Sequence, residues 1–171
     1  RKVTDNGSMT KIIIVMGVSG SGKSTIGELL ASRLGCRFYD GDDFHSGESI
    51  QKMASGIALT DNDRLPWLNA MAEAIKHWQS SQESAVLACS CLKESYRQIL
   101  IDNATVTLVY LDITPELARE RLTQRQGHFF KADLLESQFA ALQKPDNAIK
   151  VSCTDEPACM VEAIVRQLAK R

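Results

Sequence analysis

The sequence has no long apolar run, no marked excess of either charge and no signal-peptide core. A membrane-spanning helix needs roughly 20 apolar residues, and no stretch approaches that length. The formal net charge is −1, from 20 basic and 21 acidic residues, so no overall basic field favours nucleic acid. We therefore expect a protein with neither a membrane nor a nucleic acid as its partner.

The cysteines are odd in number and show no metal-binding pattern. There are five, and Cys89 and Cys91 form a C-x-C pair rather than two C-x-x-C pairs, which argues against a zinc site. Several stand in apolar runs, where cysteine acts as a small hydrophobic residue. Because this usage is typical of a reducing compartment, we expect the protein to be cytoplasmic.

No internal repeat, low-complexity segment or interdomain linker divides the chain. Its 171 residues, 44% of them hydrophobic and 24% charged, suit one globular domain with a real core. Residues 1–8 are polar and without pattern, and we interpret them as a non-native leader before a start at Met9. We therefore expect a single domain over residues 9–171.

One stretch fits the phosphate-binding pattern G-x-x-x-x-G-K-[ST], and it reads Gly17-Val18-Ser19-Gly20-Ser21-Gly22-Lys23-Ser24. A β-branched run precedes it, and apolar residues at helical spacing follow it. A strand, a glycine turn and a helix start together direct backbone N–H groups at phosphate oxygens. Lys23 would reach the β- and γ-phosphates and the Ser24 hydroxyl would bind Mg²⁺. The full pattern disfavours a turn without a ligand, so we expect a nucleoside triphosphate to bind here.

Strand and helix patterns alternate along the rest of the chain. Runs rich in β-branched and other apolar residues predict strands, which we place at residues 11–16, 36–39, 84–89, 104–111 and 148–152. Amphipathic stretches separate them. This alternation predicts an α/β fold of three layers, with a five-stranded parallel sheet between two layers of helices.

Acidic residues follow the second expected strand, at the edge where open α/β sheets bind ligands. Asp40, Asp42 and His45 stand there. A carboxylate at this place could accept a proton from an attacking hydroxyl, or hold Mg²⁺ through water. Composition alone would favour a solvated acidic turn, but the nearby phosphate loop favours a functional role.

Arg64 stands at the start of an expected helix, which Asp63 could cap and whose first turn suits Pro66. Its guanidinium group is well shaped for a carboxylate or a phosphate. An exposed ion pair with Asp61 or Asp63 is an equally good interpretation from the sequence alone.

Two further pairs of basic residues are spaced four apart, on one helix face each. Lys93 and Arg97 follow the third strand and could bind an anionic substrate or be surface charge. Arg121 and Arg125 precede Gly127, as a closing lid with phosphate-binding arginines would require. A solvated helix end is the alternative for this second pair.

Several stretches together carry a wider pattern: Met16 to Thr25, Asp40-Gly41-Asp42 with His45, Leu59 to Leu68, Ala88 to Arg97, Gly127-His128-Phe129 and Leu134 to Phe139. From about residue 10 to residue 170, the chain with these motifs resembles the gluconate kinases (gluconokinases), P-loop small-molecule kinases related to shikimate kinase. One small departure is Cys91, where we would expect alanine.

The resemblance implies a P-loop kinase fold with a helical substrate-binding segment and a lid at about residues 125–133. It implies transfer of the ATP γ-phosphate to D-gluconate, which yields 6-phospho-D-gluconate and ADP. ATP would be held by the phosphate loop through Thr25 and by Arg121 and Arg125. Ser24 would bind Mg²⁺, with Asp40 near the waters of the metal.

For the acceptor, the resemblance implies that Lys23 and Asp42 are catalytic. Lys23 would hold the phosphates, and Asp42 would orient and deprotonate the attacking hydroxyl. Arg64 would pair with the gluconate carboxylate. Weaker candidates for the sugar-acid hydroxyls or the moving phosphoryl group are His45, Lys93, Arg97 and Gln138.

These kinases are typically cytoplasmic homodimers, so the resemblance implies that state as well. Two alternatives remain open from the sequence. One is a kinase of another small acceptor, such as shikimate or a nucleoside monophosphate. The other is a nucleotide-dependent switch, which Asp42 and Arg64 argue against because a switch needs neither an acceptor-side base nor a substrate clamp.

Overall fold

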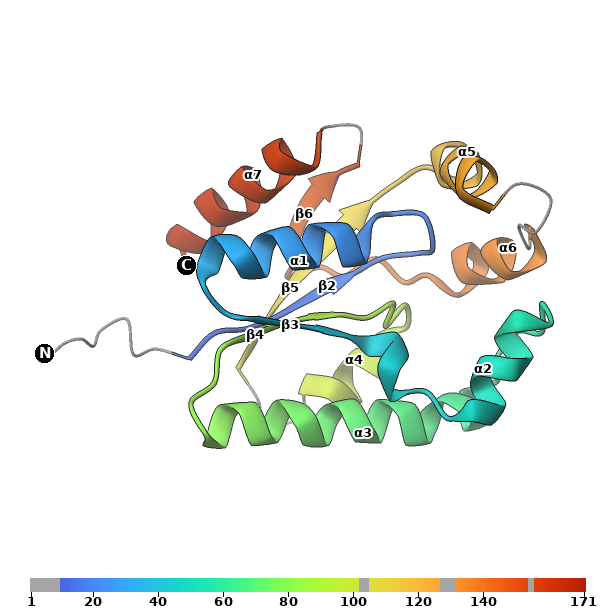
Figure 1. Cartoon of the computed structure of the whole chain (residues 1–171), viewed down its shortest axis with the longest axis horizontal. Coiled ribbons are helices and arrows are strands. Elements are labelled where there is room, and N and C mark those ends of the chain that lie inside the picture. Colours follow the sequence, from blue (N-terminus) through green and yellow to red (C-terminus); the bar gives the residue numbers. More distant parts are fainter. Residues whose placement is uncertain (1–9, 102–104, 127–131, 154–155) are drawn as a thin grey trace, which may run out of the picture.

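The structure is a computed structural model that describes residues 10–101, 105–126, 132–153 and 156–171. Its centre is one sheet of five parallel strands in the order β3-β4-β2-β5-β6 (Figure 1). The predicted five-stranded parallel sheet is therefore confirmed. The strands are β2 (Ile12–Met16), β3 (Arg37–Asp40), β4 (Ala85–Ala88), β5 (Val106–Asp112) and β6 (Ile149–Ser152).

Helices cover both faces of the sheet, which gives the predicted three layers (Figure 1). On one face lie α1 (Lys23–Leu34) and α7 (Pro157–Ala169), and on the other lie α3 (Asp61–Ser80) and α4 (Glu94–Ile101). No helix among the described residues is long and apolar enough to cross a membrane.

The central strand β2 divides the core into two layers. All of its residues are buried, because helices cover both faces of a parallel sheet. Ile13 and Val15 join one apolar cluster, and Ile12, Ile14 and Met16 join the other, as the two-residue period of a strand requires. Each buried isoleucine contributes roughly 1.5–3 kcal/mol. This strand therefore gives the loop that follows it a fixed base.

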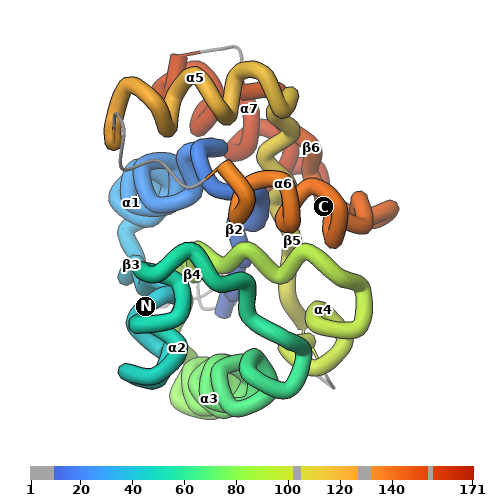
Figure 2. Tube along the Cα trace, turned by 90° about the vertical axis from the view of Figure 1, so that its right-hand side faces the viewer, coloured from blue at the N-terminus to red at the C-terminus, as the bar shows by residue number. Residues whose placement is uncertain are grey.

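The remaining helical segments gather at the carboxyl ends of the strands, which Figure 2 views end-on. There α5 and α6 lie on one side of the loop after β2, and α2 with the start of α3 lies on the other. This edge is therefore the place to look for a site. The segments are the 3₁₀ helix η2 (Gly41–Phe44), α2 (Gly47–Ala54), α5 (Pro115–Gln126) and α6 (Ala132–Ala141).

The start of α3 differs from the prediction. Thr60 is the N-cap, and its side chain accepts a hydrogen bond from the backbone N–H of Asp63, whose own carboxylate accepts one from the N–H of Thr60. This reciprocal capping box makes Asp63 the third helical residue, so the prediction of Asp63 as the cap was wrong. Pro66 consequently lies inside the helix rather than in its first turn. Arg64 lies in the first turn, beside the carboxyl edge of the sheet.

The start of α5 is set by a threonine cap and a proline. The backbone N–H of Leu117 donates to Thr114 Oγ1 at 3.1 Å, and the helix begins at Pro115. Proline suits this position because the first helical N–H has no partner within the helix. The cap directs α5 back toward the loop after β2.

Candidate active site

The loop after β2 is a phosphate-binding loop in geometry as well as in sequence. Gly22 has a φ of 92°, and α1 begins at the next residue, Lys23, with no side-chain cap hydrogen bond. The first N–H groups of α1 are therefore open to a ligand, and a helix N-terminus attracts anions. Gly20 has a φ of 85°, and a Cβ atom there would lie 3.0 Å from the Ala118 carbonyl oxygen on α5. Only glycine fits this close approach.

Lys23 lies beneath the loop with its ammonium group held toward the site. Its Nζ donates to the Val18 carbonyl oxygen at 3.2 Å. Burial lowers the pKa of Lys23, and the nearby Asp42 carboxylate opposes that shift. A phosphate ligand would add negative charge and strengthen the protonated form. The side chain can therefore serve as a phosphate-binding cation.

Ser24 and Asp40 meet beside the loop. The Ser24 hydroxyl donates to Asp40 Oδ2 at 3.0 Å, and Asp40 Oδ1 accepts from the backbone N–H of Asp42 at 2.9 Å. Among the described residues, no group of three or more histidine, cysteine, aspartate or glutamate side chains could hold a metal ion. A hydroxyl and a carboxylate nevertheless fit Mg²⁺, which takes few protein oxygens and completes its shell with water and substrate phosphates.

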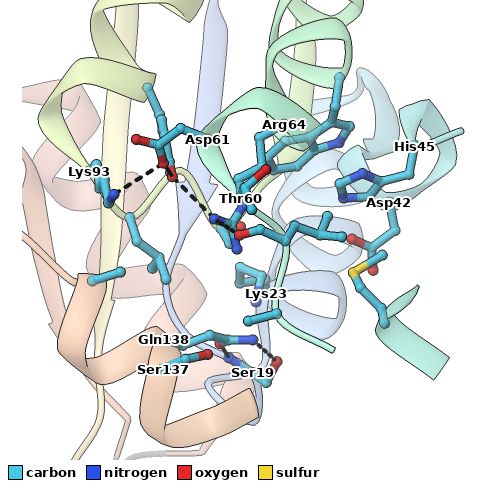
Figure 3. A pocket seen from close by; sticks show the side chains of 18 residues that line it. Ser19, Lys23, Asp42, His45, Thr60, Asp61, Arg64, Lys93, Ser137 and Gln138 are labelled. Atoms are coloured by element: carbon cyan, nitrogen blue, oxygen red, sulfur yellow. Dashed lines mark hydrogen bonds and ion pairs between the residues drawn. The ribbon is translucent and has the colours of Figure 1, made fainter. Parts of the chain in front are cut away.

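Two cavities open from the phosphate loop, and Ser19, Lys23 and Asp42 line both. The first, of 460 Å³, includes Ser24, Asp40 and Arg125, and we call it the loop cavity. The second, of 380 Å³, extends toward Arg64 and is drawn in Figure 3, and we call it the Arg64 cavity. A group bound in one cavity can therefore reach a group bound in the other at Lys23 and Asp42.

Arg64 lines its cavity with two guanidinium nitrogens, Nε and Nη2, that have no hydrogen-bond partner among the described residues. Its Nη1 donates to the Leu59 carbonyl oxygen at 2.8 Å and to the Tyr96 hydroxyl at 3.1 Å, which uses both protons of that nitrogen. Neither Nε nor Nη2 donates to any other described residue. These two nitrogens form the side-on fork that binds a carboxylate through two parallel hydrogen bonds.

The suggested ion pair of Arg64 with Asp61 or Asp63 does not form. Asp61 accepts from Lys93 Nζ at 3.1 Å, and Asp63 accepts from Lys52 Nζ at 2.9 Å. The two carboxylates are thus already paired with lysines. Arg64 keeps its charge for a ligand.

Asp61, Lys93 and Tyr96 form a hydrogen-bonded group on the same wall of the cavity. The Tyr96 hydroxyl donates to Asp61 Oδ1 at 2.5 Å, and this oxygen also accepts from Lys93. The Tyr96 hydroxyl and the Lys93 ammonium lower the pKa of Asp61, which keeps the carboxylate ionised. The hydrogen bond with Asp61 in turn raises the pKa of Lys93. The wall therefore alternates donors with an acceptor, as a ligand rich in hydroxyl groups requires.

His45 forms the opposite wall and stacks on Trp67, with ring centroids 4.2 Å apart and an angle of 11° between the planes. Trp67 Nε1 donates to the Gly41 carbonyl oxygen at 2.7 Å, which ties α3 to η2. Burial lowers the pKa of His45, and its buried Nδ1 has no partner among the described residues. The imidazole is therefore neutral at pH 7 and placed by an aromatic stack.

Asp42 lies next to His45, on the same side of the Arg64 cavity (Figure 3). Its backbone N–H is fixed by Asp40, and its carboxylate accepts no hydrogen bond from any described residue. A carboxylate that is free at this point can accept a proton from a hydroxyl brought up to the phosphate loop. The structure thus brings Asp42 to the place where the sequence predicted a base.

The structure does not bring Arg97 into either cavity. Its side chain is only 2% exposed, and its guanidinium donates to the carbonyl oxygens of Cys91, Leu92 and Gln143 and to Glu94. These contacts use all five N–H groups, so none is left for a ligand. Arg97 holds the loop before α4 in place, and we withdraw it as a substrate-binding residue.

The two arginines predicted for the lid differ in role: Arg121 makes structural contacts, whereas Arg125 lines a cavity. Arg121 Nη2 donates to the Cys153 carbonyl oxygen at 2.6 Å, and Nη1 lies 3.4 Å from the Gly20 carbonyl oxygen, so this residue ties α5 to the phosphate loop. Arg125 lines the loop cavity and remains a candidate for ATP. The centre of the expected lid, residues 127–131, lies outside the described residues.

Gln138 on α6 reaches the phosphate loop directly. Its Oε1 accepts from the backbone N–H of Ser19 at 2.6 Å, and its Nε2 donates to Ser19 Oγ at 2.9 Å. The sequence offered Gln138 only as a candidate for substrate hydroxyls. Its contact with the donor loop was not predicted, because the two residues are 119 positions apart.

Among the residues that line the Arg64 cavity, Asp61, Trp67 and Tyr96 hold predicted site side chains in place and were not themselves predicted as site residues. Asp61 stands three residues before Arg64, a spacing that places both side chains on one helix face. That spacing was a signal for Asp61 in the site. Tyr96 reaches the others across a separation of 35 residues to Asp61, which no local pattern shows.

Comparisons with known proteins indicate the family of the chain. The family model of shikimate kinase matches residues 19–165. A probable gluconokinase of Mus musculus is 43% identical over an alignment of 180 positions, gaps included, and the match covers 93% of this chain and 97% of that protein. A gluconokinase of Gluconobacter oxydans is 39% identical over 167 residues, 95% of this chain and 94% of its own length.

Among solved structures, a gluconokinase from Sinorhizobium meliloti superposes with a TM-score of 0.86 and 39% identity. That similarity covers 95% of this chain and 93% of the other. The fold thus has a counterpart over nearly the full length of the chain. The chain belongs to the gluconokinase family, within the shikimate kinase group of P-loop kinases.

Proposed function

We propose that the chain is an ATP-dependent gluconokinase, which transfers the γ-phosphate of ATP to D-gluconate and releases 6-phospho-D-gluconate and ADP. One observation carries the proposal. Arg64, whose Nε and Nη2 have no hydrogen-bond partner among the described residues, lines the same cavity as Lys23 and Asp42 beside the phosphate loop. A carboxylate clamp and a phosphate-binding loop that share one cavity suit a substrate with a carboxylate at one end and a hydroxyl at the other.

On the donor side, the loop amides and Lys23 hold the ATP phosphates in the loop cavity. Ser24 and Asp40 would hold Mg²⁺, which would neutralise charge on the β- and γ-phosphates. Arg125 approaches from α5 and adds a second cation. Arg121 supports the loop from behind through its contacts with Gly20 and Cys153.

On the acceptor side, Arg64 binds the gluconate carboxylate. The hydroxyl groups along the sugar acid meet Lys93 and Asp61 on one wall and His45 on the other. The terminal hydroxyl then lies beside Asp42, whose free carboxylate orients it and accepts its proton as the bond to phosphorus forms. Phosphoryl transfer needs little more than this positioning and charge neutralisation.

The proposal includes a cytoplasmic homodimer, for which the resemblance to gluconate kinases is the support. Light scattering coupled to size-exclusion chromatography measures the oligomeric state. A mass near twice the 18.9 kDa of one chain supports the dimer, and a mass near 18.9 kDa contradicts it.

A panel of acceptors tests the activity. ADP release is followed with gluconate, shikimate and nucleoside monophosphates, each at saturating ATP and Mg²⁺. Turnover of gluconate well above the others supports the proposal. Equal turnover of gluconate and shikimate, or no turnover of gluconate, contradicts it. Tight ATP binding without any phosphorylated product would instead indicate a nucleotide-dependent switch.

A further inference from the structure

Gln138 occupies a backbone donor that the phosphate loop would otherwise offer to ATP. Its Oε1 accepts from the Ser19 N–H at 2.6 Å, and its Nε2 donates to the hydroxyl of the same residue (Figure 3). Both residues line the Arg64 cavity, and Ser19 also lines the loop cavity. The contact therefore lies at the junction of the two cavities.

A single N–H cannot donate at full strength to Gln138 and to a phosphate oxygen at once. Successive N–H groups of such a loop form a concave site for anions. A hydrogen bond to a charged phosphate oxygen is roughly twice as strong as one to a neutral amide oxygen. Bound ATP therefore competes for the Ser19 N–H and displaces the Gln138 amide.

The displaced amide remains in the Arg64 cavity, because α6 is anchored by other residues. Leu135 is 3% exposed in the apolar core, and Phe139 packs against the same cluster. A free amide carries one acceptor oxygen and two donor protons, which suits the hydroxyl groups of a sugar acid. Binding of ATP and binding of the acceptor thus affect each other through the Gln138 side chain.

We propose that Gln138 is a positioning residue that exchanges Ser19 for the acceptor when ATP binds, so that ATP and the acceptor bind cooperatively. The identity of the acceptor as gluconate rests on the proposed function. The exchange itself concerns ATP and the loop, and it is measurable without gluconate. Coupling between two ligand sites commonly changes affinity about 5- to 150-fold. We expect the lower end of this range, because one side chain carries the exchange.

Isothermal titration calorimetry with the non-hydrolysable analogue AMPPNP and Mg²⁺ tests the proposal. The variant Gln138→Leu removes both hydrogen bonds at similar size, and Gln138→Asn keeps the amide on a shorter side chain. Gln143→Leu is the matched control, because Gln143 Oε1 also accepts a backbone N–H, that of Glu94 at 2.7 Å, but lies outside both cavities.

In the wild-type chain, gluconate should bind about fivefold more tightly when AMPPNP is present. In Gln138→Leu this factor should fall to within about twofold of one, while AMPPNP alone binds as tightly as to the wild type or more tightly. Gln138→Asn should recover part of the coupling, and Gln143→Leu should keep all of it. The expected kinetic signature is a raised KM for gluconate without a raised KM for ATP.

Two results would overturn the proposal. Weaker AMPPNP binding to Gln138→Leu in the absence of gluconate would show that Gln138 supports the loop in its nucleotide-bound form. Unchanged coupling in that variant would show that no exchange takes place. A wild-type chain that binds AMPPNP but not gluconate would refute the proposed function instead. The AMPPNP titrations of the variants would still decide whether the nucleotide displaces Gln138 from the Ser19 N–H.

Discussion

Replacement of Arg64 by alanine tests the acceptor site most directly. The free Nε and Nη2 of this residue are the groups that would bind the carboxylate, while Nη1 is held by Leu59 and Tyr96. A hydrogen bond to a charged group contributes about 1.5–3 kcal/mol. Loss of two such bonds in a cavity open to water should therefore cost roughly 3 kcal/mol, or about 10²-fold in kcat/KM for gluconate.

Steady-state kinetics with gluconate varied at saturating ATP measure this loss, and AMPPNP titration measures nucleotide binding separately. Arg64→Ala should raise KM for gluconate and leave nucleotide affinity within about twofold. Arg64→Lys keeps the charge but loses the fork, so its loss should be smaller, on the order of tenfold. Lys76→Ala is the control, because Lys76 is an exposed cation on the same helix that pairs with Glu73 and with no other described residue.

D-Glucitol, which has the hydroxyl chain of gluconate without the carboxylate, isolates the contact. The wild-type chain should prefer gluconate strongly, and Arg64→Ala should lose most of that preference because the clamp no longer distinguishes the two. Equal losses on both acceptors would show that Arg64 acts on the structure of the cavity and not on the carboxylate. A fall in nucleotide affinity as large as the fall for gluconate would also refute the assigned role.

Three further predictions follow from the same geometry. Asp42→Asn should lower kcat at least 10²-fold in single-turnover assays while AMPPNP affinity stays within about twofold, and an unchanged kcat would exclude Asp42 as the base. Arg97→Leu should lower the free energy of unfolding in urea by about 3–5 kcal/mol, since it leaves buried carbonyl oxygens and Glu94 without their partner. A variant as stable as the wild type but inactive would restore Arg97 to the site. Burial lowers the pKa of His45 below 6.5, so the unfolded chain binds a proton more readily than the folded chain. Stability should therefore fall as the pH drops below about 6.5. His45→Gln should show a shallower fall in the same urea titrations, and an identical slope would contradict the shift.

The donor half of the site was predictable because it is local. Eight consecutive residues set the phosphate loop, and the strand before it and the helix after it follow from short-range patterns. The position of Asp40 and Asp42 also followed, since the carboxyl ends of parallel strands lie at one edge of the sheet. The cap of α5 at Thr114 is local in the same way, because a cap depends only on its next three residues.

The start of α3 was harder because two caps competed within four residues. Asp63 is a good N-cap by type, but Thr60 with Asp63 three positions later forms a capping box that satisfies two N–H groups instead of one. The tighter arrangement begins the helix earlier and tolerates Pro66 in the second turn. The spacing of Thr60 and Asp63 carries this signal in the sequence, and it outweighs the preference of proline for the first turn.

Arg64 and Arg97 show why residue type alone cannot separate a ligand-binding arginine from a structural one. Both stand near helix starts at the carboxyl edge of the sheet, and both have partners that lie far away in the sequence. The difference lies in how many N–H groups those partners use. Arg97 meets three carbonyl oxygens, one of them from Gln143, and has no donor left, whereas Arg64 meets Leu59 and Tyr96 through one nitrogen only.

Tyr96 connects the charged side chains of the Arg64 cavity to one another. Its hydroxyl accepts from Arg64 and donates to Asp61, and its ring lies 5.6 Å from the Arg64 guanidinium carbon and 5.5 Å from Lys93 Nζ. Phenylalanine at this position would keep the ring and leave Arg64 Nη1 with the Leu59 carbonyl oxygen and Asp61 with Lys93. The clamp would then be held by one hydrogen bond instead of two, while both charges remain. We therefore expect the direction of the Arg64 clamp to depend on the Tyr96 hydroxyl together with the Leu59 carbonyl oxygen, much as the phosphate loop is held by the side chains of Gln138 and Arg121.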